Sequence, residues 1–452
     1  MQHRLTPIVG LVLATIPTLA LILSDRDLGP IGTVLAVILA TVGIALLFEQ
    51  EHRGRPVRPA WIVLAGVVVS SAAVMVEPRG SHDLWAYAMY GRIVSVYHAN
   101  PWVLAPEHFS HDPFLARVGA GWRGTTSIYG PGFVGIAAVV TKIAGASALA
   151  TQVLFKLLFA IATGAGGYLI YRRTRSPAAT ACVLLHPAIA VAGIAGGHND
   201  VLVGLGLLGA VLFALDDRPV AAGLSAGLAT LVKLTGGIGI LALLIWSLTR
   251  HDSRWATRFG AASLGLVALA YLPFGLTGFS AFAQNRGSLS RASVWQIPRL
   301  LTGIDRQHAA ANFGLPLGLT TTIVTIGTVV TVALTIAIAI RMRRAPDPII
   351  PTIGAVGTFL VFAAYVLPWY PAWVIPVIAL APRTPMSRLL LLQGSVLVVI
   401  YELKFQGLSS GPAGVVWWLS VFASLGIAIA FLRSLRASPP TREADTRTNI
   451  ER

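Results

Sequence analysis

Long apolar stretches alternate with short polar connectors along almost the whole chain. Most stretches are close to the ~20 residues that a helix needs to cross about 30 Å of hydrocarbon. None shows the two-residue alternation that marks the strands of an outer-membrane barrel. We therefore predict roughly 12 to 14 membrane-spanning helices. The candidate spans cover residues 6–23, 31–48, 60–76, 148–170, 178–194, 201–215, 219–233, 235–249, 259–276, 319–340, 349–366, 370–381, 388–402 and 414–432.

Two segments depart from this regular pattern. An additional apolar piece runs from Phe133 to Ala146. For the loops on either side to face as assigned, residues 133–171 must cross the membrane only once in total. The additional piece must therefore re-enter the membrane or lie in its interface. Lys142 and Lys156 in this region are expected to snorkel toward the membrane surface. The short stretches between 219 and 249 are interrupted at Lys233-Leu234-Thr235-Gly236-Gly237. Such an interruption predicts a broken or tilted helix that lines a cavity.

Composition supports the assignment to the membrane. The 452 residues are 55% hydrophobic and 12% charged, and their mean hydropathy is +0.74, whereas soluble domains carry about 25% charged residues. The chain is therefore predicted to be an all-α polytopic membrane protein. Its single cysteine, Cys182, lies in an apolar stretch, which excludes an intramolecular disulfide and a cysteine-based metal cage. We predict no cofactor, and the sequence leaves a requirement for a divalent metal open.

The basic residues define an orientation in the bilayer. The net charge of +16 does not predict a nucleic-acid partner, because the basic residues flank apolar stretches instead of forming one face. With a cytoplasmic N-terminus, 21 of the 34 Lys and Arg fall on the cytoplasmic side, as the positive-inside rule requires. Both termini are then cytoplasmic, and the long loops 77–132 and 277–318 face outward. Residues 1–432 would form the transmembrane domain, and 433–452 a disordered cytoplasmic tail.

The outward loops hold most of the chemically useful side chains. Asp83 stands a few residues after the end of an apolar stretch, and a carboxylate at such a depth usually has a functional role. Asp83 is therefore the candidate catalytic base, with capping of the helix that begins near Leu84 as the alternative. The candidate substrate ligands are Tyr87, Arg92, Asn100, Asp112, Tyr129, His198, Asn199, Asp200, Lys233, Arg286, Arg291, Trp369, Tyr370 and Trp373.

Several candidates also have a purely structural interpretation. Arg92 could snorkel or pair with a nearby glutamate, and residues 198–200 could cap the helix that follows them. The aromatic residues in 369–373 could form the aromatic belt that is common at membrane interfaces. Lys233 could snorkel. His186, which precedes a proline, is expected to be an interior histidine with satisfied ring nitrogens.

One base and a set of cations suit a particular reaction. A sugar carried on a lipid phosphate leaves behind an anion that needs no protonation. The enzyme then requires one base to deprotonate the acceptor hydroxyl, and cations to hold the phosphate. Asp83 would be the base, and arginines would bind the phosphate. A retaining mechanism would need a second carboxylate about 5 Å away, for which the first loop offers no clear candidate.

Six motifs that occur in order between residues 81 and 373 resemble those of a known family. They resemble the actinobacterial polyprenol-phosphate-mannose-dependent α-mannosyltransferases of the GT-C superfamily, in particular the α-1,6-mannosyltransferases. The motifs are Ser81-x-Asp83-x-x-x-Tyr87-x-x-x-Gly91-Arg92, Asn100-Pro101-Trp102 with Asp112-Pro113, Tyr129-Gly130-Pro131, Gly197-His198-Asn199-Asp200, Val232-Lys233-Leu234-Thr235 and Pro368-Trp369-Tyr370-x-x-Trp373.

The resemblance implies both a fold and a reaction. The fold would be a GT-C multi-helix bundle with a long first catalytic loop on the outer face. The reaction would be inverting transfer of mannose from a polyprenyl-phosphate donor, with Asp83 as base. The acceptor would be an envelope glycolipid or a mannan, as in the synthesis of lipomannan.

Two departures from the family pattern leave the donor sugar and the linkage open, and two alternative functions remain. Trp102 stands where a Tyr or Phe is expected, and Ser127-Ile128 replaces a Thr/Ala-Pro pair before Tyr129. One alternative is therefore a GT-C enzyme that uses another lipid-phosphate sugar, such as arabinose. The other is a transporter or flippase for a lipid-linked sugar. Sparse charge at the membrane midplane and the absence of an evident internal repeat favour the enzyme over the transporter.

Overall fold

Helices form all of the regular structure in the part of the chain that the computed structural model describes. The described residues are 2–24, 28–78, 81–250, 253–279, 289–301, 317–403 and 412–435. Within them, six helices are long and apolar enough to cross a membrane, and seven shorter helices are also apolar. The prediction of an all-α polytopic membrane protein is confirmed. Arg286, much of the loop 277–318 and the tail from residue 436 onward lie outside the described residues.

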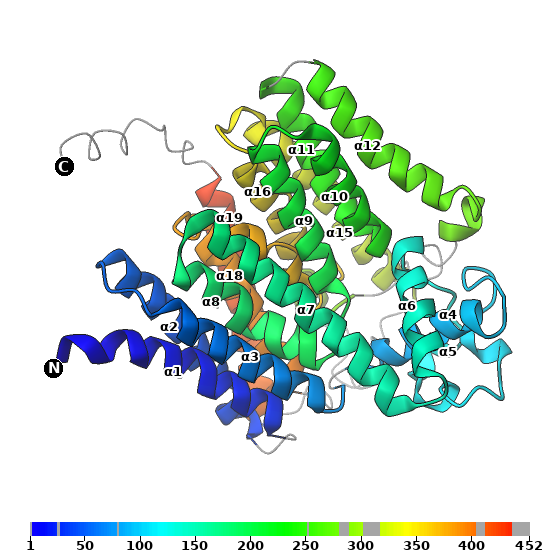
Figure 1. The fold of residues 1–452 in the computed structure, drawn as a ribbon, viewed down its shortest axis with the longest axis horizontal. Coiled ribbons are helices and arrows are strands. Elements are labelled where there is room, and N and C mark those ends of the chain that lie inside the picture. Colours follow the sequence, from blue (N-terminus) through cyan, green and yellow to red (C-terminus); the bar gives the residue numbers. More distant parts are fainter. Residues whose placement is uncertain are drawn as a thin grey trace.

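The helices follow the apolar stretches of the sequence closely (Figure 1). The α-helices are α1 (Gln2–Leu23), α2 (Gly29–His52), α3 (Pro59–Met75), α4 (Asp83–Ser95), α5 (Ala120–Arg123), α6 (Pro131–Ala144), α7 (Ala148–Thr174), α8 (Pro177–Leu185), α9 (Asp200–Leu215), α10 (Pro219–Val232), α11 (Gly237–Arg250), α12 (Ser253–Tyr271), α14 (Gln296–Leu301), α15 (Leu317–Arg341), α16 (Ile349–Phe362), α17 (Ile375–Ile378), α18 (Pro385–Glu402) and α19 (Pro412–Ser434). The shorter helical turns are η1 (Pro106–His108), η2 (Leu115–Arg117), the π-helix η3 (Ala188–Ala195), η4 (Leu234–Gly236), η5 (Gly275–Phe279), η7 (Met342–Arg344) and η8 (Tyr370–Trp373).

One candidate span is not a continuous helix. The stretch predicted at 370–381 consists of the 3₁₀ turn η8 followed by the four-residue α17. Prolines at 368, 371 and 376 account for the interruption, because each lacks the N–H that a regular helix would use. The buried backbone that results lies among other helices, as irregular structure at membrane depth requires.

The long loop that contains α4 and α6 forms one end of the molecule. Figure 1 places α4 and α6 side by side at the end opposite the start of α1, and the two helices are in contact. The additional apolar piece at 133–146 is therefore the short helix α6, which packs along α4. This arrangement holds the start of α4 against the ends of the bundle helices.

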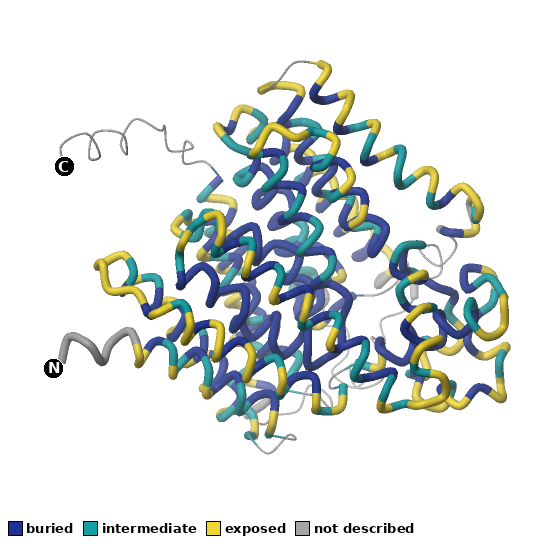
Figure 2. The backbone as a smooth tube through the Cα atoms, viewed as in Figure 1, coloured by how far each residue is buried: buried dark blue, intermediate teal, exposed yellow. Residues whose placement is uncertain are grey.

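Burial distinguishes a central segment from the outer helices. Residues Pro177–Ala195 are entirely buried, and Figure 2 shows buried backbone running through the middle of the bundle. On α3 and α7 most of the exposed side chains are apolar, with Val67 56% and Ile161 61% exposed. Apolar surfaces of this kind suit contact with lipid tails. The buried segment carries the turn on which the site is built.

A proline shapes that central segment. Pro187 ends α8 because it lacks an N–H and disfavours a helical conformation at the residue before it. His186 Nδ1 accepts a hydrogen bond from the N–H of Ala188 at 3.1 Å, and its Nε2 lies 3.2 Å from the carbonyl oxygen of Leu391. The prediction of a satisfied interior histidine is confirmed. The chain then continues as the π-helix η3, a form often found near functional sites.

Lys156 does not snorkel, contrary to the prediction. Its side chain is fully buried, and its Nζ donates hydrogen bonds to the carbonyls of Ala73 and Val76 at the end of α3. The side-chain amide of Gln152 also donates to the carbonyl of Val76, at 2.9 Å. The last carbonyls of a helix lack partners within the helix. By satisfying them, α7 fixes the point at which the chain leaves α3 toward Asp83.

Candidate active site

A tight turn between η3 and α9 presents three polar residues in succession. Gly197 has a φ of +75°, which glycine adopts without steric cost. The N–H of His198 donates to the carbonyl of Gly193 at 2.8 Å. Asn199 occupies the N-cap position of α9, but its side chain makes no capping hydrogen bond. The interpretation of this segment as a helix cap is therefore wrong.

Asp83 and His198 meet although they are far apart in sequence. Asp83 is the first residue of α4, and its backbone N–H donates to Ser81 Oγ at 3.0 Å. The N-cap position of α4 is held by His82 and not by Asp83, which excludes the capping interpretation. Asp83 Oδ2 lies 3.7 Å from His198 Nε2. Both side chains are buried, with Asp83 7% exposed and His198 1% exposed.

Burial sets the protonation of this pair. Removal of the Asp83 carboxylate from water raises its pKa to about 6, against the opposing effects of Ser81 and Lys233. Burial lowers the pKa of the His198 imidazole to about 3, so the ring is neutral at physiological pH. His198 Nδ1 lies 2.6 Å from the carbonyl of Ala192 and donates to it, because a carbonyl can only accept. The lone pair of Nε2 therefore faces Asp83.

A second buried pair lies beside the first. Asp200, the first residue of α9, is fully buried, and its Oδ1 accepts hydrogen bonds from Lys233 Nζ at 2.9 Å and from Trp373 Nε1 at 2.5 Å. Lys233 has an extended backbone at the break between α10 and η4. The prediction of a broken helix here is confirmed. Snorkelling of Lys233 is excluded because its ammonium group pairs inside the protein.

Aromatic rings surround the Lys233 ammonium group. Its Nζ lies 4.5 Å from the ring centroid of Tyr370, 5.6 Å from that of Trp373 and 6.0 Å from that of Tyr129. The rings of Tyr370 and Trp373 are stacked on each other at 4.4 Å. Attraction between the cation and these ring faces adds to its pairing with the Asp200 carboxylate.

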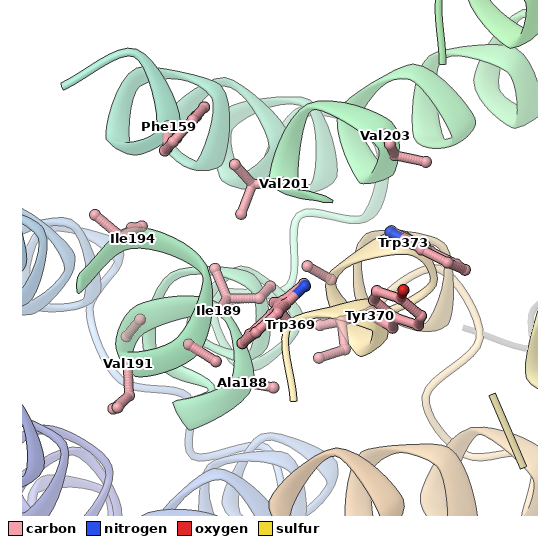
Figure 3. Packing of buried hydrophobic residues seen from close by; sticks show 14 of the residues in the cluster. Phe159, Ala188, Ile189, Val191, Ile194, Val201, Val203, Trp369, Tyr370 and Trp373 are labelled. Atoms are coloured by element: carbon pink, nitrogen blue, oxygen red, sulfur yellow. The ribbon is translucent and has the colours of Figure 1, made fainter. Parts of the chain in front are cut away.

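Trp369 supports the other pair. Its ring stacks on His198 with 3.4 Å between centroids and 11° between planes. Figure 3 shows Trp369, Tyr370 and Trp373 together between Ile189 of η3 and Val203 of α9. These three aromatic side chains are at most 7% exposed. The aromatic-belt interpretation is wrong, because belt residues face the membrane interface.

Tyr87 and Tyr129 close the site on the side of the first loop. Tyr87 follows Asp83 by one helical turn and so lies on the same face of α4. The ring centroids of Tyr87 and Tyr129 are 4.8 Å apart in an edge-on arrangement. The chain next to Tyr129 runs beside the end of α10, where the N–H of Gly130 donates to the carbonyl of Val232 at 3.1 Å.

Gly130 allows this close approach, so replacing it is expected to destabilise the site. A Cβ at position 130 would clash with the carbonyl oxygen of Leu231. Gly130→Ala should cost about 1–3 kcal/mol and lower the melting temperature of the purified protein. Gly135→Ala on α6 is the matched control, since a Cβ there meets open space. Equal melting temperatures for the two variants would contradict the prediction.

Arg92 and Asp112 pair with each other away from Asp83. Arg92 lies nine residues along α4 from Asp83, which places it on the opposite face and about 13 Å farther along the axis. Arg92 Nε donates to Asp112 Oδ2 at 2.7 Å, and Nη1 donates to the carbonyl of Gly145 at 3.0 Å. The acidic partner of Arg92 is thus an aspartate and not a glutamate. Substrate binding by this pair stays a prediction.

Asn100 and Arg291 have different surroundings. Asn100 Oδ1 accepts from the N–H of Trp102 at 2.9 Å, and the Trp102 indole N–H donates to the carbonyl of Tyr129 at 3.1 Å. Asn100 thereby shapes the turn that supports Tyr129. Arg291 is exposed on the segment from 289, which Ser290 anchors by its backbone N–H to the carbonyl of Ala364 at 2.9 Å.

Several buried polar atoms of the site have no hydrogen-bond partner among the described residues. They are both amide atoms of Asn199, Oδ2 of Asp200 and Nε2 of His198. Buried polar groups are normally paired, so these atoms indicate a place for a polar ligand. No group of three His, Cys, Asp or Glu side chains that could hold a metal occurs in the described part of the chain.

The sequence analysis missed Tyr365, a tyrosine in the neighbourhood of Asp83. It lies three residues before Pro368, just outside the motif that holds the other aromatic residues of the segment.

Comparison with known proteins identifies the family of this chain. A family model described as alpha-(1→6)-mannopyranosyltransferase, N-terminal domain, matches residues 4–250. The chain belongs to this mannopyranosyltransferase family. The matched range contains Asp83, residues 198–200 and Lys233, whereas the aromatic segment 369–373 lies beyond it.

Two relatives carry the name alpha-(1→6)-mannopyranosyltransferase A. The protein from Mycobacterium tuberculosis is 25% identical over 453 residues, which cover 93% of this chain and 84% of the relative. The protein from Corynebacterium glutamicum is 28% identical over 197 residues, covering 42% of this chain and 39% of the relative. With its family and its apolar helices established, the chain is a multi-pass membrane mannosyltransferase.

Proposed function

We propose that this enzyme transfers a mannosyl residue from a polyprenyl-phosphate donor to a hydroxyl of an envelope glycolipid or mannan, at the outer face of the cell membrane. The observation that supports this most is the buried cluster in which Asp83 lies against His198, beside the Asp200–Lys233 pair. The names of the two relatives state an α-(1→6) linkage, and we extend that linkage to this chain.

Asp83 would act as the general base. With a pKa of about 6, the carboxylate is mostly ionised at pH 7 and is more basic than an exposed aspartate. It takes the proton of the acceptor hydroxyl while that oxygen bonds to the anomeric carbon of the donor. The bond from this carbon to the lipid phosphate breaks at the same time, and the phosphate leaves as an anion. His198 Nε2 lies 3.7 Å from Asp83 Oδ2, so an approach of about 0.5 Å or more would let it accept a hydrogen bond from the protonated carboxyl group.

The state of Asp200 favours inversion over retention. A retaining enzyme needs a second carboxylate as nucleophile. Asp200 is fully buried, and one of its oxygens already accepts hydrogen bonds from Lys233 and Trp373. A carboxylate whose negative charge is balanced by a lysine and by hydrogen bonds is a weak nucleophile. We therefore propose direct displacement of the lipid phosphate by the acceptor hydroxyl, with inversion at the anomeric carbon.

The proposed orientation puts the site outside the cell membrane. The basic connectors and both termini would be cytoplasmic, and Asp83 would lie at the opposite end of the bundle with α4 and α6. On that side a lipid phosphate is the available carrier of an activated sugar. Lys233, Arg291 and Arg286 are the proposed partners of its phosphate, and Arg286 lies outside the described residues.

A donor assay would test this proposal. The purified protein in lipid nanodiscs should form a mannosylated product from polyprenyl-phosphate mannose and none from GDP-mannose, and linkage analysis should find a 6-linked mannose. If the enzyme instead used polyprenyl-phosphate arabinose efficiently, the donor sugar would be arabinose and not mannose. In proteoliposomes, movement of the donor across the bilayer without any glycosidic product would instead indicate a transporter.

A further inference from the structure

A pocket of about 430 Å³ lies between α2 and α18, far from the site that holds Asp83. Its apolar walls come from Ile44 and Phe48 on α2 and from Leu391 and Leu392 on α18. The pocket extends to His52 at the C-terminal end of α2, and Figure 1 shows that end of α2 on the side of the molecule opposite α4 and α6. The pocket therefore has no part in the proposed transfer reaction.

The pocket has the shape of a groove that opens sideways. A hydrogen bond of 2.7 Å between Thr41 Oγ1 and Ser395 Oγ joins α2 to α18 at its inner end. Ser395 follows Arg388 by seven positions, which corresponds to about 10 Å along the axis of α18. Leu392 on the wall is 46% exposed, so the groove is open toward the surface that faces lipid. Such a groove suits the upper part of a hydrocarbon chain.

Two arginines stand at the other end of the groove. Arg383 and Arg388 line it and are exposed, and neither guanidinium group has an ion pair or a hydrogen bond with another described residue. One carboxylate, that of Glu49, also lines the pocket, but it is paired with Arg53 at 2.6 Å. The end of the groove is therefore a positive site without a protein counter-ion.

We propose that this pocket binds one anionic phospholipid, with its phosphate between Arg383 and Arg388 and one chain along the apolar walls. α18 begins at Pro385, so the two arginines lie at the level of lipid headgroups. Basic pockets between transmembrane helices on the cytoplasmic side bind anionic headgroups. Arginine also suits phosphate because its planar fork donates two parallel hydrogen bonds. The proposed orientation assigns the lipid to the cytoplasmic leaflet, and the proposal is otherwise independent of the transfer reaction.

Native mass spectrometry can test the site directly. The protein in detergent is mixed with equal amounts of phosphatidylglycerol and phosphatidylcholine of the same chain length. After release from the detergent, it should retain one phosphatidylglycerol. Arg383→Gln with Arg388→Gln should weaken that binding about tenfold or more, because charge-assisted hydrogen bonds are lost. Arg254→Gln with Arg258→Gln is the matched control, since both arginines are exposed on α12 outside the pocket. Melting temperatures would establish that each variant is folded.

Two further experiments distinguish binding of a lipid from binding of a free anion. Ala45→Trp keeps both arginines but fills the groove at an exposed position, and it should reduce phosphatidylglycerol binding. Millimolar inorganic phosphate should not displace the lipid. Equal retention of the two lipids, equal losses in the pocket and control variants, or complete displacement by phosphate would each overturn the proposal. None of these results depends on whether the enzyme transfers mannose.

Discussion

Asp83→Asn is expected to lower the rate of mannosyl transfer by about 10²–10⁴-fold, the usual contribution of a positioned general base. The amide cannot accept the proton of the acceptor hydroxyl, yet it has nearly the same size as the carboxylate. Among the described residues, the only ion-pair partner of Asp83 is His198, whose ring is neutral, and the N-cap of α4 is His82, so the variant should fold and express normally. The measurement is product formation from polyprenyl-phosphate mannose at equal protein concentration.

The control for this variant is Glu77→Gln, which removes an exposed carboxylate from the same loop and should leave transfer unchanged. The pH profile offers a second readout. Because the base must be deprotonated and burial raises the Asp83 pKa to about 6, kcat/KM should rise with pH through about 6 and then level off. Full activity in Asp83→Asn, or the same rising limb in its residual activity, would exclude Asp83 as the base.

Lys233→Met is expected to destabilise the protein by about 3–5 kcal/mol, because it leaves the Asp200 carboxylate buried without its counter-charge. Asp200 is fully buried, and Lys233 also contacts the faces of Tyr370 and Trp373. The site should therefore open or repack when the ammonium group is lost. The measurement is a large fall in the melting temperature, accompanied by loss of mannosyl transfer.

Two comparisons make this prediction specific to a buried pair. Arg173→Met breaks the Arg173–Asp216 pair, whose side chains are 43% and 48% exposed, and should cost about 1 kcal/mol or less. The double variant Asp200→Asn with Lys233→Met removes both charges and should recover much of the lost stability. If Lys233→Met were no more harmful than Arg173→Met, the Asp200–Lys233 pair would have no special role in holding the site together.

Local patterns were sufficient for most of the helices. The apolar stretches gave the positions of α1 to α3, of α7 and of most later helices, since the membrane requires each span to satisfy its own backbone hydrogen bonds. The polar residues and the glycine pair of Lys233-Leu234-Thr235-Gly236-Gly237 likewise predicted the break at Lys233. The segment at 370–381 was harder to predict, because its apolar composition resembles a span while its prolines divide it into short turns.

The sequence by itself determined the class of protein, the family motifs and the residue types that the chemistry needs. It could not decide which of those residues act together, because a polar side chain near a helix end fits a cap, a belt or a site equally well. The tertiary structure decided this by burial: Asp83 against His198, and Lys233 against Asp200, are held out of water by helices distant in sequence. The same packing made Arg92 a partner of Asp112 and turned Lys156 inward to the end of α3. Contacts between distant segments set these environments, and hydropathy along one segment carries no information about them.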